Sequence, residues 1–252
     1  MAPPSPLADA LLRRHPLQRM HAPSRGASAL LHALGLSSFA YSFIHLVQNP
    51  NPVNESYGGH MQFLTIIGLS LATATFACGL LADVSLSRRA FQVKNTLSVA
   101  SAPMECLISV LYWGLRAIDT ELVLPDGAPP LAWGADLSFH AVPAIALAGD
   151  LLFFSPPWTI AFLPALGLSG AIACGYWLWI ERCYQFNNFY PYPIFDLLDT
   201  PQRIGLFAAS ALLMTLSTSL LMWLYAVING RDVGGLAGGN VQRSRSGNVK
   251  GE

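Results

Sequence analysis

Charged residues are scarce in this sequence, and their scarcity excludes an ordinary soluble domain. Only 11% of the 252 residues are charged, against roughly 25% in soluble domains. Because 53% are hydrophobic, the chain cannot hide its apolar surface from water by folding alone, which favours a membrane protein. The fourteen acidic and fourteen basic residues cancel, so the net positive charge typical of nucleic-acid binding is missing and no nucleic-acid partner is expected.

Cysteines are few as well. Their spacing matches no metal site and no disulfide framework; the four are Cys78, Cys106, Cys174 and Cys183. A membrane haem site would need facing histidines on two helices, and beside His32 and His45 only His140 lies within another apolar stretch. We therefore expect neither a metal nor a cofactor.

Apolar residues occur in six long stretches, at about 27–47, 61–82, 95–116, 137–155, 158–180 and 204–228. Each is near the ~20 residues that a helix needs to cross a bilayer. The stretches are continuously apolar rather than alternating, which indicates helices and not a barrel. The sequence thus predicts an all-α, polytopic membrane protein with six transmembrane helices. The stretch 137–155 is the least regular, because it contains Pro143 and Asp150.

The basic residues predict the orientation. With six spans, eleven of the fourteen lysines and arginines fall in the segments 1–26, 83–94 and 229–252, all on one side of the membrane. The positive-inside rule therefore predicts that both termini are cytoplasmic. Five spans would place the basic C-terminal tail outside.

Two terminal segments flank the predicted membrane domain, residues 27–229. The Pro- and Arg-rich residues 1–26 are expected to be a disordered cytoplasmic lead-in, with a mitochondrial transit peptide as the alternative. No cleavable signal peptide is evident, so the first span is expected to act as the insertion signal. The Gly- and Arg-rich residues 230–252 are expected to be disordered.

Polar residues inside spans are costly and are functional candidates by default; they are His32, His45, Glu105, Arg116, His140 and Asp150, with Thr65 added for its position. With span starts near Met61 and Asp136, Thr65 and His140 each lie four residues past the start of a predicted span, so both are expected ~6 Å below the outer membrane border. A hydroxyl beside a histidine is the minimum arrangement for nucleophilic acyl transfer. Alternatively, Thr65 bonds a carbonyl one turn back, and His140 bonds a neighbouring helix.

The two acids allow a different class of function. Glu105 and Asp150 are expected to form interhelical hydrogen bonds, but they could also be the working groups of a non-enzymatic transporter or lipid-binding protein. Asp150 is ten residues beyond His140, about 15 Å along a helix, too far to orient its ring.

The outer loops add two hypotheses. Asn54 begins an N-glycosylation triplet on the side predicted to be outside. The aromatic segment 184–196, "YQFNNFYPYPIFD", is either an interfacial aromatic belt or a lid over a lipid-sized pocket.

The motif "YGGHMQFLTIIGL", residues 57–69, resembles the signature of the androgen-induced gene 1 family, which includes the androgen-dependent TFPI-regulating protein. Further matches follow in the family's order, and the resemblance covers about residues 27–229; they are "LLADV" (80–84), "LYWGL" (111–115), "SFHAVPAIALAGD" (138–150), "GYWLWI" (175–180) and "YPYPIFDLL" (190–198).

This resemblance implies a multispan hydrolase that cleaves fatty acid esters of hydroxy fatty acids, with Thr65 as nucleophile and His140 as the catalytic histidine. It implies a multi-pass protein of the endoplasmic reticulum or plasma membrane, with its active site near the lumenal or extracellular side. The chain departs from the animal pattern at Asp136 and Leu137, where an Asn-His pair is usual, and at Asp150, where Glu is usual. These departures bear on lipid preference, and the oligomeric state is not predicted.

Overall fold

The regular structure of the described residues is helical throughout. The structure, a computed structural model, describes residues 15–124 and 131–230. Seven helices form the body; they are α2 (Ala27–Gln48), α3 (Leu64–Ser85), α4 (Arg88–Ile118), α5 (Trp133–His140), α6 (Val142–Phe154), α7 (Phe162–Asn187) and α9 (Thr200–Asn229). Short helices occupy connections: η1 (Pro52–Glu55), η2 (Gly59–Gln62), η3 (Thr120–Leu122) and α8 (Ile194–Leu197). The all-α prediction is confirmed.

Five of these helices are long and apolar enough to cross a membrane: α2, α3, α4, α7 and α9. The fourth predicted span, 137–155, is broken into α5 and α6, which meet at a bend of 44°. The bend falls at Ala141, just before Pro143. Because proline lacks an N–H and its ring crowds the preceding turn, a straight helix is disfavoured here. The described residues therefore contain five helices able to cross a membrane, or six such segments if the bent pair forms one span.

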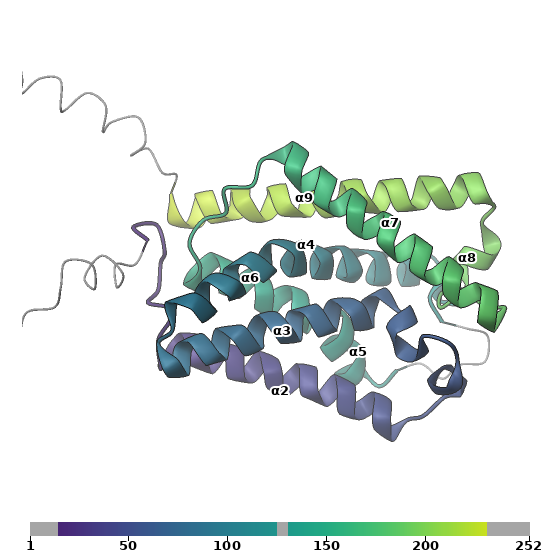
Figure 1. Ribbon diagram of the computed structural model, residues 1–252, viewed down its shortest axis with the longest axis horizontal. Coiled ribbons are helices and arrows are strands. Elements are labelled where there is room, and N and C mark those ends of the chain that lie inside the picture. Colours follow the sequence, from purple (N-terminus) through teal and green to yellow (C-terminus); the bar gives the residue numbers. More distant parts are fainter. Residues whose placement is uncertain (1–14, 125–130, 231–252) are drawn as a thin grey trace, which may run out of the picture.

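The helices lie roughly along one axis, and both described ends of the chain are at the same end of the bundle (Figure 1). The Arg19 guanidinium donates to the carbonyl of Ile228 at 3.1 Å, and the Tyr225 hydroxyl donates to the carbonyl of Leu17 at 3.2 Å. A chain that crosses the membrane an even number of times must have both ends on the same side, as this arrangement does. That this end faces the cytoplasm stays a prediction.

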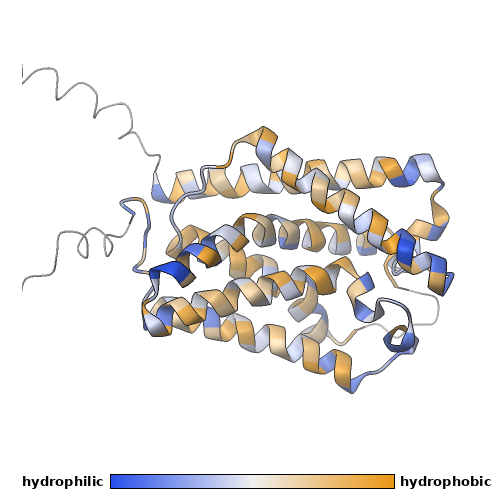
Figure 2. Ribbon diagram, in the orientation of Figure 1, coloured by the Kyte–Doolittle hydropathy of each residue, from blue (hydrophilic) through white to orange (hydrophobic). Residues whose placement is uncertain are grey.

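Hydrophobic residues predominate along the helices, and hydrophilic residues gather toward the ends of the bundle (Figure 2). Val47, Leu163 and Leu178 are each more than 70% exposed. A water-soluble helical domain would bury such side chains, whereas a bilayer solvates them. The exterior thus agrees with the transmembrane assignment.

Residues 15–26, part of the segment for which disorder was expected, pack against the bundle. Gln18 is buried, and its amide donates to the carbonyls of Met20 and Ala22. The Met20 N–H in turn donates to the carbonyl of Phe153 on α6 at 2.8 Å. These bonds satisfy backbone groups that would otherwise be left without partners. Residues 1–14 and 231–252, where disorder was also expected, lie outside the described residues.

Candidate active site

Thr65 is the second residue of α3, and the turn before it is fixed to α7. Gly58 adopts φ +84°, and a side chain there would lie 2.9 Å from the sulfur of Cys183, so glycine meets both a backbone and a packing requirement. The Tyr176 hydroxyl donates to the carbonyl of Gln62 at 2.9 Å. These contacts fix the direction in which α3 begins, and hence the position of Thr65.

An apolar cavity begins at Thr65 and extends between α4, α7 and α9. Most of its wall is aliphatic or aromatic, with Leu107, Ile108 and Met214 among the contributors. The polar side chains on the wall are Thr65, Tyr112, Ser169, Tyr176, Tyr192 and Ser210. Such a cavity, with few polar groups to fix orientation, is typical of a site for an apolar ligand.

Tyr192 comes to Thr65 from the aromatic segment 184–196. Its phenol oxygen lies 3.3 Å from the Thr65 Oγ1 and accepts from the Thr65 N–H at 3.4 Å. The Tyr192 ring packs edge-on against Phe63, with centroids 5.5 Å apart. Burial raises the pKa of Tyr192 above its usual range, so its hydroxyl keeps its proton. The segment thereby forms part of the cavity wall, as a lid would.

His140 is oriented by an acid. Its Nδ1 lies 3.0 Å from the Asp136 carboxylate, one turn earlier on α5. Asp136 is buried and also accepts from the guanidinium of Arg116. The His140 ring stacks on Tyr112, with centroids 3.4 Å apart. With Nδ1 directed at the carboxylate, Nε2 is the nitrogen left for proton transfer.

The structure brings Thr65 and His140 to one end of the bundle but does not join them. Among the described residues no hydrogen bond links Thr65 to His140. The His140 ring instead stacks on the ring of Tyr112, which lines the cavity. The observed helix starts also differ from those used to predict that Thr65 and His140 lie at the same depth. Thr65 is the second residue of α3, whereas His140 is the last residue of α5, because α5 begins at Trp133.

Glu105 lies one turn below Thr65. A side chain built on Gly68 would lie 2.8 Å from the Glu105 Oε1, and Gly68 is on the same face of α3 as Thr65. Glu105 is buried, and within the described part of the chain its Oε1 has no hydrogen-bond partner. Among the described residues, this oxygen therefore does not form the interhelical hydrogen bond that was expected of Glu105.

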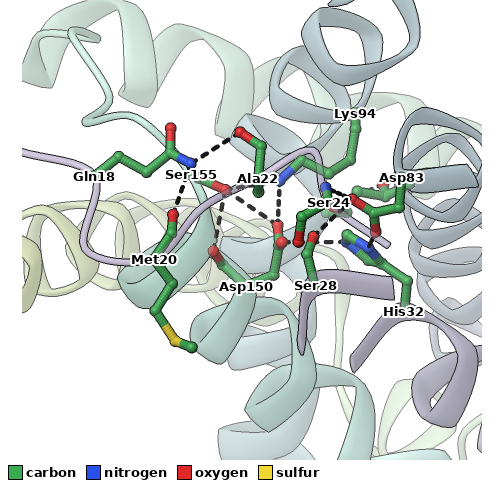
Figure 3. A network of polar contacts seen from close by, with 12 residues as sticks. Gln18, Met20, Ala22, Ser24, Ser28, His32, Asp83, Lys94, Asp150 and Ser155 are labelled. Carbon is green, nitrogen blue, oxygen red and sulfur yellow. Dashed lines mark hydrogen bonds and ion pairs between the residues drawn. The ribbon is translucent and has the colours of Figure 1, made fainter. Parts of the chain in front are cut away.

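Asp150 does form the expected interhelical contacts, in a second polar group at the other end of the bundle. This ionic cluster consists of His32, Asp83, Lys94 and Asp150, all at most 1% exposed (Figure 3). The Lys94 ammonium donates to Asp150 at 2.7 Å, and His32 lies 2.7 Å from Asp83 and 3.2 Å from Asp150. Four helices, α2, α3, α4 and α6, are thus tied together.

The geometry assigns a charge to His32. Both of its ring nitrogens face carboxylate oxygens, which only accept hydrogen bonds. Each nitrogen therefore carries a proton, and the cluster balances two cations against two anions. Further hydrogen bonds come from the hydroxyls of Ser28 and Ser155 and from the N–H of Ser24. A fully paired and hydrogen-bonded cluster is the form in which buried charges are tolerated.

Two residues of this candidate site were not identified from the sequence, Asp136 and Tyr192. Asp136 was noted only as a departure from the family pattern, although its spacing of four residues from His140 places both on one helix face. Tyr192 had no local signal, because its approach to Thr65 depends on the path of the chain after α7.

The helical bundle, its apolar exterior and its apolar cavity define a multi-pass membrane protein. The family model described as FAR-17a/AIG1-like protein matches residues 27–226, so the chain belongs to the FAR-17a/AIG1-like family. This confirms the resemblance found in the sequence.

Two relatives support the assignment. The chain is 34% identical over 201 residues to the UPF0641 membrane protein PJ4664.05 of Schizosaccharomyces pombe, covering 79% of this chain and 90% of that protein. It is 24% identical over 181 residues to the human androgen-induced gene 1 protein, covering 65% of this chain and 75% of that protein. No solved structure matches the chain.

Proposed function

We propose that the protein hydrolyses fatty acid esters of hydroxy fatty acids within the membrane, with Thr65 as nucleophile and His140 as general base. The observation that carries the proposal is the position of the Thr65 hydroxyl on the wall of an apolar cavity. An acyl chain would occupy the cavity and present its ester carbonyl to this hydroxyl. The family resemblance of the Thr65 motif supports the same reaction.

In the proposed reaction the Thr65 Oγ1 attacks the ester carbonyl carbon while its proton passes to Nε2 of His140. The leaving hydroxy fatty acid receives that proton, and water then releases the acyl group from Thr65 by the same steps. Asp136 holds the imidazole through Nδ1 and stabilises the imidazolium that forms. Since the two catalytic groups are not in contact in the resting structure, the Tyr112 ring has to shift when substrate binds; catalytic contacts often tighten only in the complex.

The rival function, a transporter working through Glu105 and Asp150, is less well supported. Asp150 is enclosed by Lys94 and His32 and is 0% exposed. A carboxylate that binds and releases a cargo ion needs access to the cargo, whereas this one already has its counterions. Dissipation of a substrate gradient in liposomes, abolished by Asp150→Asn, would favour the transporter instead.

Covalent labelling tests the proposal. The full-length protein in detergent micelles is treated with a fluorophosphonate probe, and the modified residue is mapped. We expect an adduct on Thr65 that is absent from Thr65→Ala and His140→Ala. Thr73→Ala is the matched control, because Thr73 is on the same helix and its hydroxyl bonds the Leu69 carbonyl. A folded protein that is never labelled, or is labelled elsewhere, would contradict the assignment.

A further inference from the structure

Among the described residues, Tyr192 is the side chain that hydrogen-bonds the Thr65 hydroxyl. Its role depends on whether its own proton is free for another acceptor. The phenol oxygen accepts from the Thr65 N–H at 3.4 Å. Its own proton is directed either at the Thr65 Oγ1, 3.3 Å away, or at another acceptor in the cavity. Both distances are long for hydrogen bonds, so a carbonyl oxygen entering the cavity can compete for this proton.

The other two cavity tyrosines have committed hydroxyls. Tyr176 donates to the carbonyl of Gln62 at 2.9 Å. The Tyr112 hydroxyl accepts from Arg116 at 3.0 Å and faces the carboxylate of Asp136. Among the three phenols on the cavity wall, Tyr192 alone lies against Thr65 with a proton available.

Two backbone donors near Thr65 are also in use. The Gly59 N–H, at the turn into α3, donates to the carbonyl of Ser56 at 3.0 Å. The Thr65 N–H is one of the first-turn donors of α3 that have no partner within the helix, and it is bonded to Tyr192. Gly58 and Gly59 therefore shape the turn before α3. The side-chain donor next to the Thr65 hydroxyl is the phenol of Tyr192.

We propose that the Tyr192 hydroxyl donates a hydrogen bond to the oxyanion formed when Thr65 attacks the ester carbonyl; this role rests on the proposed function. As the bond from Oγ1 to carbon forms, the carbonyl π electron pair moves onto the carbonyl oxygen. That oxygen is bonded to the carbon now joined to Oγ1, so it lies within reach of a donor that already contacts Oγ1. Tyr192 keeps its proton throughout, and when the carbonyl re-forms the bond to the leaving alkoxide breaks, with His140 supplying the proton.

The position of Tyr192 is held independently of Thr65, as a pre-organised donor requires. Its ring packs against Phe63 and Phe195, with centroids 5.5 and 6.0 Å away. The neighbouring Tyr190 ring stacks on Tyr184 at 4.3 Å, and its hydroxyl accepts from Arg203. The segment is therefore anchored on both sides of the phenol.

The test compares three variants with the unaltered protein, each as purified full-length protein in micelles, using a chromogenic long-chain acyl ester. Loss of one oxyanion donor costs roughly 10²–10³-fold in rate, so we expect Tyr192→Phe to lower kcat by that factor and to change KM by less than about threefold. Tyr225→Phe, the matched control, should retain kcat within about threefold, because its hydroxyl donates to the carbonyls of Leu17 and Ser155 and Tyr225 does not line the cavity. Thr65→Ala should be inactive.

The outcomes separate the two proposals. Hydrolysis by Thr65→Ala at the normal rate would overturn the proposed function, and the role of Tyr192 with it. An inactive Thr65→Ala together with a fully active Tyr192→Phe would overturn only the role of Tyr192.

A second measurement excludes a merely structural effect. A long-chain trifluoromethyl ketone, which forms a tetrahedral oxyanion on Thr65, should bind Tyr192→Phe at least about tenfold more weakly, while the plain methyl ketone binds equally well. Equal loss for both ketones would contradict the proposal. If Tyr192→Phe does not fold, fluorotyrosine at position 192 keeps the hydroxyl, and kcat should then change with the acidity of the phenol; an unchanged kcat would contradict it.

Discussion

The two ends of the bundle use polar residues in opposite ways. In the ionic cluster every charge has a counterion and no side chain is more than 1% exposed. At the candidate active site, about 27 Å away along α3 at 1.5 Å per residue, the Thr65 hydroxyl has one loose partner and borders a cavity. The difference teaches that burial and polarity alone do not mark a membrane active site. A polar side chain that has few hydrogen-bond partners and borders a cavity is a better indication of an active site.

His140→Ala should cause the largest change in rate. Removing a general base lowers kcat by roughly 10²–10⁴-fold. The loss of stability should be smaller than the one expected for Lys94→Met below, because Asp136 keeps the Arg116 guanidinium as a partner. His45→Ala is the control, since His45 is near the same end but contacts Phe139 rather than the cavity. If His140→Ala instead lost much stability but kept its kcat per folded molecule, His140 would be a stabilising residue and not a catalytic one.

Lys94→Met should cause the largest change in stability. It leaves Asp150 buried with one cation fewer, and breaking a buried pair costs about 3–5 kcal/mol. Thermal unfolding in micelles should show this loss, while the surviving folded protein keeps its kcat. Arg89→Met, which removes an exposed cation from the same helix, should be within about 0.5 kcal/mol of the unaltered protein. Similar melting curves for the two variants would show that the ionic cluster does not stabilise the fold.

Glu105→Gln should have a smaller and opposite effect on stability. Within the part of the chain that the structure describes, the Glu105 Oε1 is buried without a hydrogen-bond partner. Replacing the acid by a neutral amide of the same shape removes the cost of burying an ionisable group. We expect unfolding to become harder by up to about 1 kcal/mol, with hydrolysis unchanged within about threefold. A complete loss of hydrolysis would place Glu105 among the catalytic groups.

Glycan mapping should assign the two ends to the two sides of the membrane. Asn54 is exposed and close to the candidate site in η1, so we expect glycosylation there in microsomes and its loss in Asn54→Gln. A glycan on a triplet engineered into 83–94, next to the ionic cluster, would instead invert the predicted orientation.

The sequence predicted the helical bundle well because apolar stretches of bilayer length are set by local composition. It did not predict the break at Ala141, because the effect of Pro143 on a span depends on whether neighbouring helices hold it straight. The helix starts also differ from the predicted ones, because α3 begins at Leu64 rather than near Met61 and α5 at Trp133 rather than near Asp136.

The partners of the buried polar residues could not be predicted from spacing. Asp150 was correctly expected to bond between helices, but that it meets His32 and Lys94 depends on how α2 and α4 pack on α6. Thr65 and His140 remain predictions as catalytic residues. The structure adds Asp136, which lies one turn from His140 on the same helix, and Tyr192, whose contact with Thr65 joins segments far apart in the sequence.

The break at Ala141 has an electrostatic consequence for His140. In an unbroken span this residue would lie in mid-helix, whereas here it is the last residue of α5. The carbonyls at a helix C-terminus carry the negative end of its dipole, which stabilises a nearby cation by about 0.3–1 kcal/mol. The imidazolium that forms when His140 takes the proton of Thr65 would therefore lie at the negative end of its own helix.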